Sequence, residues 1–331
     1  DIARGSTVAL LGPSGSGKSS LMAVLSGLER ASGGTLLVAG EDFATLDEDG
    51  DTPLSSACGA GSLEVASWLR KEGAKVKGVS NKLGESPLHL ASEDGSSLEL
   101  VGWLVDVGCG VNQRVKSTGF TPVLCACAAA DPALEVVRLL HVRGAKLKGR
   151  EAAAKDGEQP IHKACRTSDS ELLCWLLAQG VGIDTPAAVY PYRQPIHFVV
   201  ESDESVEMMT ALLEVAERSQ QLPIVLEACD KEGDRASHLA AQAADLPLLE
   251  LLHGRGADLE AANRKNVRPM HRACACDAVD VVKALHEQFG CTLEGAPAKM
   301  GSDSKRGGGF LPVHAAAESY GLRTLQYLHA K

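Results

Sequence analysis

The stretch DGDTPLSSAC, residues 49–58, decides the fold because its pattern returns along the rest of the chain. In each copy a proline, replaced once by alanine, is followed four residues later by a small residue, which is alanine in all copies but one. The proline-phase residues are Pro53, Pro87, Pro122, Pro160, Pro195, Ala236, Pro269 and Pro312. Repetition at intervals of 33 residues (236 to 269) to 43 residues (269 to 312) predicts an array of stacked repeats.

Each copy predicts two short helices. Thr52, Ser86 and Thr121 stand directly before a proline, which is the arrangement of a helix N-cap followed by proline at the first helical position. A second apolar stretch with a leucine pair follows, and several copies then end on Gly-Ala, where glycine can cap the helix C-terminus. One such pair cannot bury its apolar face alone, so its stability must come from stacking on its neighbours.

This pattern resembles the ankyrin repeat over about residues 47–331, in about eight repeats of which the last is incomplete. The resemblance implies a mainly α solenoid in which each repeat has a helix-turn-helix and a β-turn finger. It also implies a scaffold that binds another protein on the concave surface of fingers and first helices. The partner is unidentified, and its candidate contacts are Lys82, Leu83, Glu85, Arg114, Lys116, Phe120 and Arg193.

The two longest intervals between repeats contain RSQQLPIVLEACDKEG (residues 218–233) and EGAPAKMGSDSKRGGG (residues 294–309). We interpret both segments as loop insertions.

The segment before the repeats contains GPSGSGKSS, residues 12–20, which has the spacing of a P-loop between a β-type run and a helix-compatible run. Backbone N–H groups of such a loop point at phosphate oxygens, Lys18 would reach the β- and γ-phosphates, and Ser19 would ligate Mg²⁺. The candidate nucleotide-binding residues are Gly12, Ser14, Gly15, Ser16, Gly17, Lys18, Ser19 and Ser20.

Residues 1–49 resemble the start of the ATP-binding subunit of ABC transporters, closest to the bacterial lipoprotein-release and macrolide-export type. The resemblance includes the P-loop, its helix, the SGG turn and the LDED phrase at residues 46–49. It implies a partial P-loop βαβ segment over residues 1–46. The glutamine loop, the LSGGQ signature, Walker B and the switch histidine are not found after Asp49, so we assign no catalytic residue.

Three interpretations remain open. The first is a non-enzymatic ankyrin scaffold whose vestigial loop binds ATP phosphates at most, with no required cofactor and with ATP and Mg²⁺ as the candidate ligands. The second is an ATP-binding or ATPase module of ABC type with accessory repeats. The third is a recent fusion, or an erroneous gene model, that joins the two patterns within LDEDGDTPL, residues 46–54.

Charge and hydropathy exclude several classes of partner. The formal net charge is −10 and no basic face emerges, which argues against nucleic acid. The longest apolar run, residues 123–130, is far shorter than the ~20 residues of a membrane span, and no secretory signal is found. We therefore expect a cytoplasmic protein without membrane insertion and with reduced cysteines. A first residue of Asp, and an end inside the eighth repeat, lead us to expect incomplete termini.

The histidines and cysteines follow the repeat rather than a metal or catalytic pattern. Six histidines lie two residues after the proline phase and the other four directly follow the leucine pair or its equivalent. Cys58, Cys127, Cys165 and Cys274 share one position, directly after the small residue, where a buried thiol packs like alanine. We therefore predict structural roles for both residue types and no metal site.

Overall fold

The computed structural model describes residues 46–95, 97–129, 134–187, 192–202, 204–293 and 311–331. The chain divides into two compact units, Asp1–Lys155 and Asp156–Lys331, and each unit is described by itself. The described residues form helices and turns, which confirms the expectation of a mainly α protein. The α/β segment expected over residues 1–46 lies outside the described residues except for Leu46.

In its described residues the first unit contains three helix pairs. They are α2 (Pro53–Gly59) with α3 (Leu63–Lys71), α4 (Pro87–Asp94) with α5 (Leu98–Val107), and α6 (Pro122–Ala128) with α7 (Leu134–Val142). The first helices α2, α4 and α6 pack in succession, and so do the second helices α3, α5 and α7. This is the layered stacking that an array of repeats requires.

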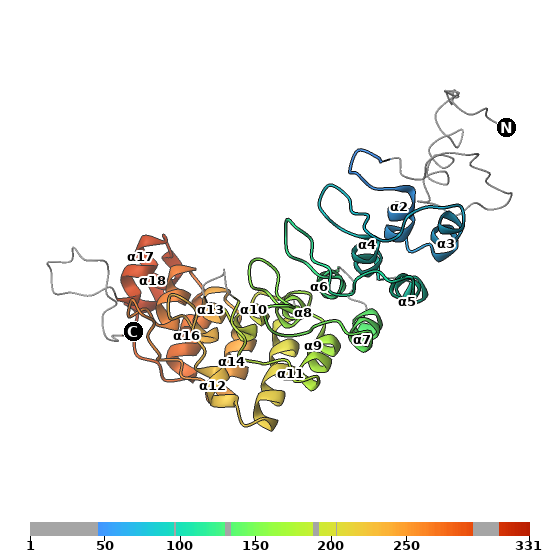
Figure 1. Ribbon diagram of the computed structural model, residues 1–331. Helices are drawn as coiled ribbons and strands as arrows, with labels where there is room; N and C mark the ends of the chain where they lie inside the picture. Colours follow the sequence, from blue (N-terminus) through green and yellow to red (C-terminus); the bar gives the residue numbers. More distant parts are fainter. Residues whose placement is uncertain (1–45, 96, 130–133, 188–191, 203, 294–310) are drawn as a thin grey trace. The chain divides into compact units, whose positions relative to one another are not determined.

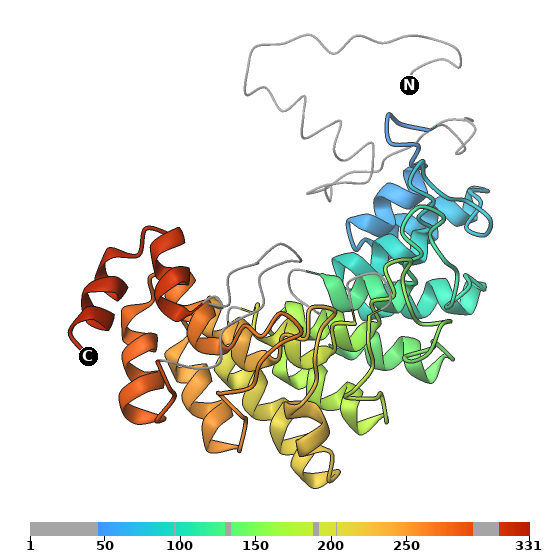
Figure 2. The ribbon, with the colours of Figure 1, turned by 90° about the vertical axis from the view of Figure 1, so that its left-hand side faces the viewer.

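The second unit continues the same plan. Its pairs are α8 (Pro160–Arg166) with α9 (Ser170–Ala178), α10 (Pro195–Val199) with α11 (Ser205–Arg218), α13 (Ala236–Gln242) with α14 (Leu246–Gly254), α15 (Pro269–Ala275) with α16 (Val279–Lys283), and α17 (Pro312–Glu318) with α18 (Leu322–His329). Helix α16 runs on as a π-helical turn, η1 (Ala284–Gln288). Figure 2 shows these pairs from the side, with α15 to α18 in orange and red.

The proposed caps are present in the first unit. Each first helix begins at a proline-phase residue. The hydroxyls of Thr52 and Thr121 accept the N–H groups of Ser55 and Leu124 at 3.1 Å and 3.4 Å, and Ser86 hydrogen-bonds the ring of His89. At the other end of a second helix, Gly108 caps α5 with φ +96°, a conformation in which a Cβ is costly.

One of the two expected loop insertions was wrong in part. Within residues 218–233 the chain forms a short helix, α12 (Leu222–Leu226), which packs against α11 through the buried side chains of Val225 and Leu226. Pro223 stands within its first turn, where a missing N–H costs nothing. The other segment, residues 294–309, lies outside the described residues.

The position four residues after the proline phase is buried throughout. Its members are 0–1% exposed and are Ala57, Ala91, Ala126, Ala164, Val199, Ala240, Ala273 and Ala316. Neighbouring first helices therefore approach one another across small side chains. Any larger residue there must push two repeats apart, since protein interiors are close-packed.

We expect Ala273→Leu to destabilise the protein by about 1–3 kcal/mol, because added methylenes overpack a filled interface. Ala275→Leu is the matched control, since Ala275 is exposed on the same helix α15. Urea unfolding followed by circular dichroism measures both variants. Equal stability of the two variants would contradict the packing assigned to Ala273.

Candidate functional site

In five repeats, the loop before the first helix is a tight finger, which is closed by a backbone hydrogen bond from its first to its last residue. The N···O distance of this bond is 2.8–3.0 Å in five fingers, which are residues 47–51, 81–85, 115–120, 230–234 and 263–267. Figure 1 shows the first three standing side by side in the first unit, ahead of α2, α4 and α6.

An acidic or amide side chain shapes four of these fingers. The Oδ1 atom of Asp230 accepts the N–H groups of Glu232 and Asp234 at 2.8 Å and 2.9 Å, and Asp47, Asn81 and Asn263 bond in the same way. Such local bonds favour tight turns. The sequence analysis did not predict this role. The sequence does contain a pattern that indicates it, because each of the four fingers begins with Asp or Asn and has Gly or Asn three residues later.

Neighbouring fingers are joined through their backbones. In the first unit the N–H of Lys82 donates to the carbonyl of Asp49 at 3.0 Å, and the N–H of Lys155 donates to Thr118 at 2.9 Å. In the second unit Arg264 donates to Glu232 at 3.1 Å. Lys82 and Arg264 are the second residues of their fingers, and Lys155 occupies the same position in the loop before α8, five residues before Pro160. These bonds therefore set the position of that residue against the preceding finger.

The contact between fingers explains why glycine is required at their corners. Gly233 has φ +84°, and a Cβ there would lie 2.8 Å from the backbone nitrogen of Arg264. Gly119 has φ +79°, and a Cβ there would lie 2.9 Å from the nitrogen of Lys155. A side chain at either glycine would therefore strain the backbone at that residue. It would also collide with the next finger and push it away.

The histidines two residues after the proline phase link each helix start to the following finger. Nδ1 of His162 accepts the N–H of Gln159 at 2.9 Å, and Nδ1 of His238 accepts that of Arg235 at 3.1 Å. Since Nδ1 accepts, the ring proton is on Nε2, which donates to the carbonyls of Thr185 at 2.9 Å and Val267 at 3.0 Å. Both ring nitrogens are thus occupied by the backbone.

Burial keeps these rings neutral. Removal from water lowers the pKa of four of them, which are His89, His162, His197 and His238. A protonated ring would also carry a hydrogen on Nδ1, where it would face the N–H that it now accepts. These observations confirm the predicted structural role of this histidine position.

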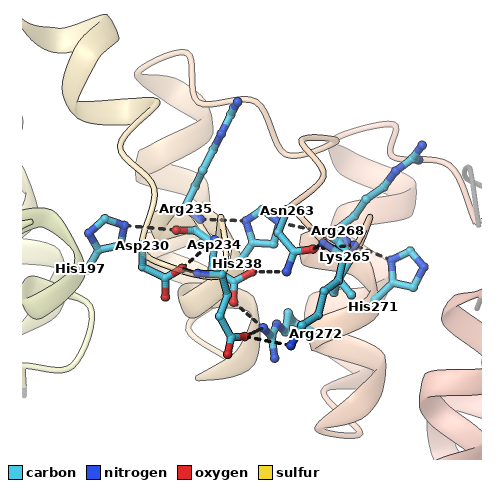
Figure 3. A network of polar contacts seen from close by, with 12 residues as sticks. His197, Asp230, Asp234, Arg235, His238, Asn263, Lys265, Arg268, His271 and Arg272 are labelled. Carbon is cyan, nitrogen blue, oxygen red and sulfur yellow. Dashed lines mark hydrogen bonds and ion pairs between the residues drawn. The ribbon is translucent and has the colours of Figure 1, made fainter. Parts of the chain in front are cut away.

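A polar network joins the fingers 230–234 and 263–267 (Figure 3). The carboxylate of Asp234 is 3% exposed, accepts the side-chain amide of Asn263 at 2.7 Å and pairs with the guanidinium of Arg272. Its backbone carbonyl accepts Nε2–H of His197 at 3.2 Å. Because the carboxylate is hydrogen-bonded and paired, its burial is compensated within the protein.

Glu158 stands at the same repeat position as Asp234, two residues before the proline phase. Its carboxylate is 1% exposed and pairs with the ammonium of Lys163 and with the guanidinium of Arg166, the latter at 3.2 Å. The carboxylate of Glu158 is therefore paired within its own repeat, whereas that of Asp234 pairs with Arg272 of the following repeat.

Five of the seven predicted partner contacts lie on two adjacent fingers of the first unit, and Arg114 directly precedes the second of these fingers. Lys82, Leu83, Arg114 and Lys116 are exposed, and Leu83 is 60% exposed. Ser117 joins the two fingers, because its hydroxyl donates to the carbonyl of Leu83 at 2.9 Å.

The remaining predicted contacts are less exposed. Glu85 and Phe120 are half-buried, and Glu85 accepts the side-chain amide of Asn81 at 3.0 Å. Arg193 belongs to the second unit, where it is half-buried and pairs with Glu201.

Arg114 links two segments of the chain, a structural role that the sequence did not indicate. Its guanidinium donates to the carbonyl of Arg150 at 2.9 Å and to that of Ala153. It therefore ties the third finger to the chain that leads into the next repeat.

The predicted nucleotide-binding residues, Gly12 to Ser20, lie outside the described residues. Among the residues that the structure describes, no group of three or more His, Cys, Asp and Glu side chains is arranged to hold a metal ion. None of the helices in this part of the chain combines the length and the apolar character that a membrane span needs.

The four cysteines predicted to pack like alanine are fully buried: Cys58, Cys127, Cys165 and Cys274. Burial raises the pKa of three of these thiols, that of Cys274 to about 12 and those of Cys58 and Cys165 further. Thiols of this kind are inert as nucleophiles.

Comparison with known proteins agrees with the repeat architecture. A family model described as "Ankyrin repeats (3 copies)" matches residues 21–115. The B-cell lymphoma 3 protein homolog of Mus musculus is 28% identical over 257 residues, and B-cell lymphoma 3 protein of Homo sapiens is 29% identical over 240 residues. These matches cover 76% and 72% of this chain, but the chain spans only about half of the relatives, 55% and 50% of their lengths.

A second similarity covers a short segment. The macrolide export ATP-binding/permease protein MacB of Escherichia coli K12 is 57% identical over 49 residues, which is 15% of this chain and 8% of that protein. Activity of the transporter cannot be transferred through so small a share.

We expect the free energy of unfolding to fall as pH is lowered from about 7.5 to 5. The four buried histidines have lowered pKa values, so the unfolded chain binds more protons below the ordinary histidine pKa of about 6.5. Their contribution is complete above that pH and is lost below it, at about 1.4 kcal/mol per pH unit for each proton bound only by the unfolded chain. Urea unfolding across this range measures the slope. His238→Gln should flatten it, and an unchanged slope would contradict a neutral His238.

With the repeated helix pairs, fingers and buried histidines in place, the family match and the two B-cell lymphoma 3 relatives support ankyrin repeats in this chain.

Proposed function

We propose that this protein is a cytoplasmic, non-enzymatic scaffold that binds another protein through its fingers and first helices. One observation carries the proposal. The fingers of the first unit are joined by hydrogen bonds to backbone carbonyls, from the N–H of Lys82 and the hydroxyl of Ser117, while Lys82, Leu83 and Lys116 remain exposed. A fixed backbone with exposed, varied side chains lowers the entropic cost of binding, which favours recognition of a partner.

The chemistry of the described residues fits this function better than catalysis. Both ring nitrogens of His162 and His238 are occupied, burial raises the pKa of the thiols of Cys58, Cys165 and Cys274, and the buried carboxylates of Glu158 and Asp234 are paired. The polar atoms of these side chains are thus engaged in structural contacts within the protein, so they do not serve as catalytic groups.

Affinity capture with the full chain tests the proposal. A finger variant, Lys82→Ala/Leu83→Ala/Lys116→Ala, is compared with a control, Lys71→Ala/Val142→Ala/Lys146→Ala, whose residues are also exposed but lie away from the fingers. We expect proteins that the wild type and the control enrich equally and that the finger variant loses by about tenfold, since a few contacts carry most binding energy. Equal capture of the enriched proteins by both variants would contradict the proposal that the fingers bind the partner.

The alternative is an ATP-binding module of transporter type with accessory repeats, and the similarity to MacB over 49 residues is the observation in its favour. The scaffold proposal allows the loop around Lys18 at most a residual affinity for ATP phosphates, with Ser19 toward Mg²⁺. The scaffold function requires neither ATP nor Mg²⁺ as a cofactor.

Isothermal titration with Mg-ATP separates the two functions. For the scaffold we expect weak or absent binding, no ATP turnover, and the same partner capture with and without nucleotide. Lys18→Ala, which removes the charge that would meet the phosphates, is the matched variant. Turnover in the wild type that Lys18→Ala abolishes would favour the transporter-type module.

A further inference from the structure

The second position of the finger is basic in three consecutive repeats, which are those that begin with α4, α6 and α8. The residues are Lys82, Lys116 and Lys155, which we call the lysine row, and all three are exposed. The same position holds Lys231 and Arg264 in the second unit, and Glu48 in the first finger of the chain.

The backbone at each member of the row lies against the preceding finger. Lys82 and Lys155 donate their N–H groups to Asp49 and Thr118 at 3.0 Å and 2.9 Å. The nitrogen of Lys116 lies so close to the preceding finger that a Cβ on Gly84 would be 3.2 Å away from it. The row is therefore set by the fold, while its ammonium groups reach solvent.

The charge of the row is not neutralised within the described part of the chain. None of its three members pairs there with a carboxylate, and Lys82 Nζ donates instead to the backbone carbonyl of Glu48 at 2.5 Å. The nearby Glu85 accepts from Asn81, so it is already engaged. This contrasts with Lys163 and Arg272, which each meet a buried carboxylate.

Two further features lie beside the row. Leu83, next to Lys82, leaves an apolar side chain 60% exposed on the same finger. The guanidinium of Arg114 is held by backbone carbonyls, and its Nη2 would lie 3.0 Å from a Cβ on Gly119, at the corner that approaches Lys155. Arg114 thus adds a fixed positive charge to this edge.

The geometry of a finger sets the spacing of the row. Each finger contributes two chain segments, and hydrogen-bonded segments lie about 4.8 Å apart, so equivalent residues recur about every 10 Å. Packed helices, 8–10 Å apart, give a similar period. An extended peptide rises about 3.3 Å per residue, so roughly every third residue of such a peptide would meet one lysine.

We propose that the finger edge of the first unit binds an extended segment of a partner protein that carries an acidic residue at about every third position. Lys82, Lys116 and Lys155 each meet one carboxylate, and Leu83 contacts an apolar side chain between two of them. This inference rests on the proposed scaffold function and names the chemistry of the partner.

Fluorescence anisotropy with labelled peptides tests the match. One peptide has glutamate at every third position, and a second has the same composition with its glutamates in one block. Lys82→Glu/Lys116→Glu/Lys155→Glu is the row variant. Lys71→Glu/Lys75→Glu/Lys146→Glu is the control, because it changes the net charge equally at exposed lysines away from the fingers.

We expect the spaced peptide to bind the wild type and the control variant with equal affinity. It should bind the row variant about tenfold more weakly or worse, because three exposed ion pairs together contribute a free energy of that size. The blocked peptide should bind the wild type more weakly than the spaced one. Raising the salt concentration should weaken the binding, since exposed charges are screened. Circular dichroism and urea unfolding verify that both variants fold.

Three results would overturn the inference: equal loss of binding in the row and control variants, equal affinity for the spaced and blocked peptides, or tighter binding of single-stranded oligothymidylate than of either peptide. The capture experiment with the alanine finger variant keeps the two proposals apart. If that variant loses its partner while no preference for the spaced peptide is found, the scaffold function stands and the acidic segment is wrong.

Discussion

The contact between neighbouring repeats is the constraint on which the rest of this structure depends. A helix pair of this size cannot bury its apolar face alone, so it is stable only when another pair covers it. The buried small residues, such as Ala126 and Ala240, allow the first helices to approach closely enough for that cover. The fingers must then follow the spacing that the helices impose.

Hydrogen bonds of buried histidines also link neighbouring repeats. Histidines such as His162 and His238 accept from the start of their own helix and donate to the carbonyl of a later finger. Where the sequence has Ser55 or Leu124 at that position, a threonine N-cap takes over part of the role. Stability and presentation of the fingers are therefore coupled, because the same bonds that join the repeats also fix the backbone behind the exposed side chains.

The repeat chemistry also separates two kinds of charge. Carboxylates two residues before the proline phase, in Glu158 and Asp234, are buried and paired, whereas lysines at the second finger position remain in solvent. Buried charges must be compensated inside the protein, since an unpaired one is costly. Exposed charges carry no such requirement, so they are free to determine which partner is recognised.

The sequence by itself determined the helix starts at the proline phase, the caps at Thr52 and Thr121, and the structural use of the histidines, because each depends on local residue types at a fixed spacing. Only the tertiary structure decided what meets across repeats. The holding role of Arg114, the paired carboxylate of Asp234 and the helix α12 within an expected loop depend on residues 34 or more positions apart, or on packing against α11. Such contacts follow from the stacking distance between repeats, which no single repeat encodes.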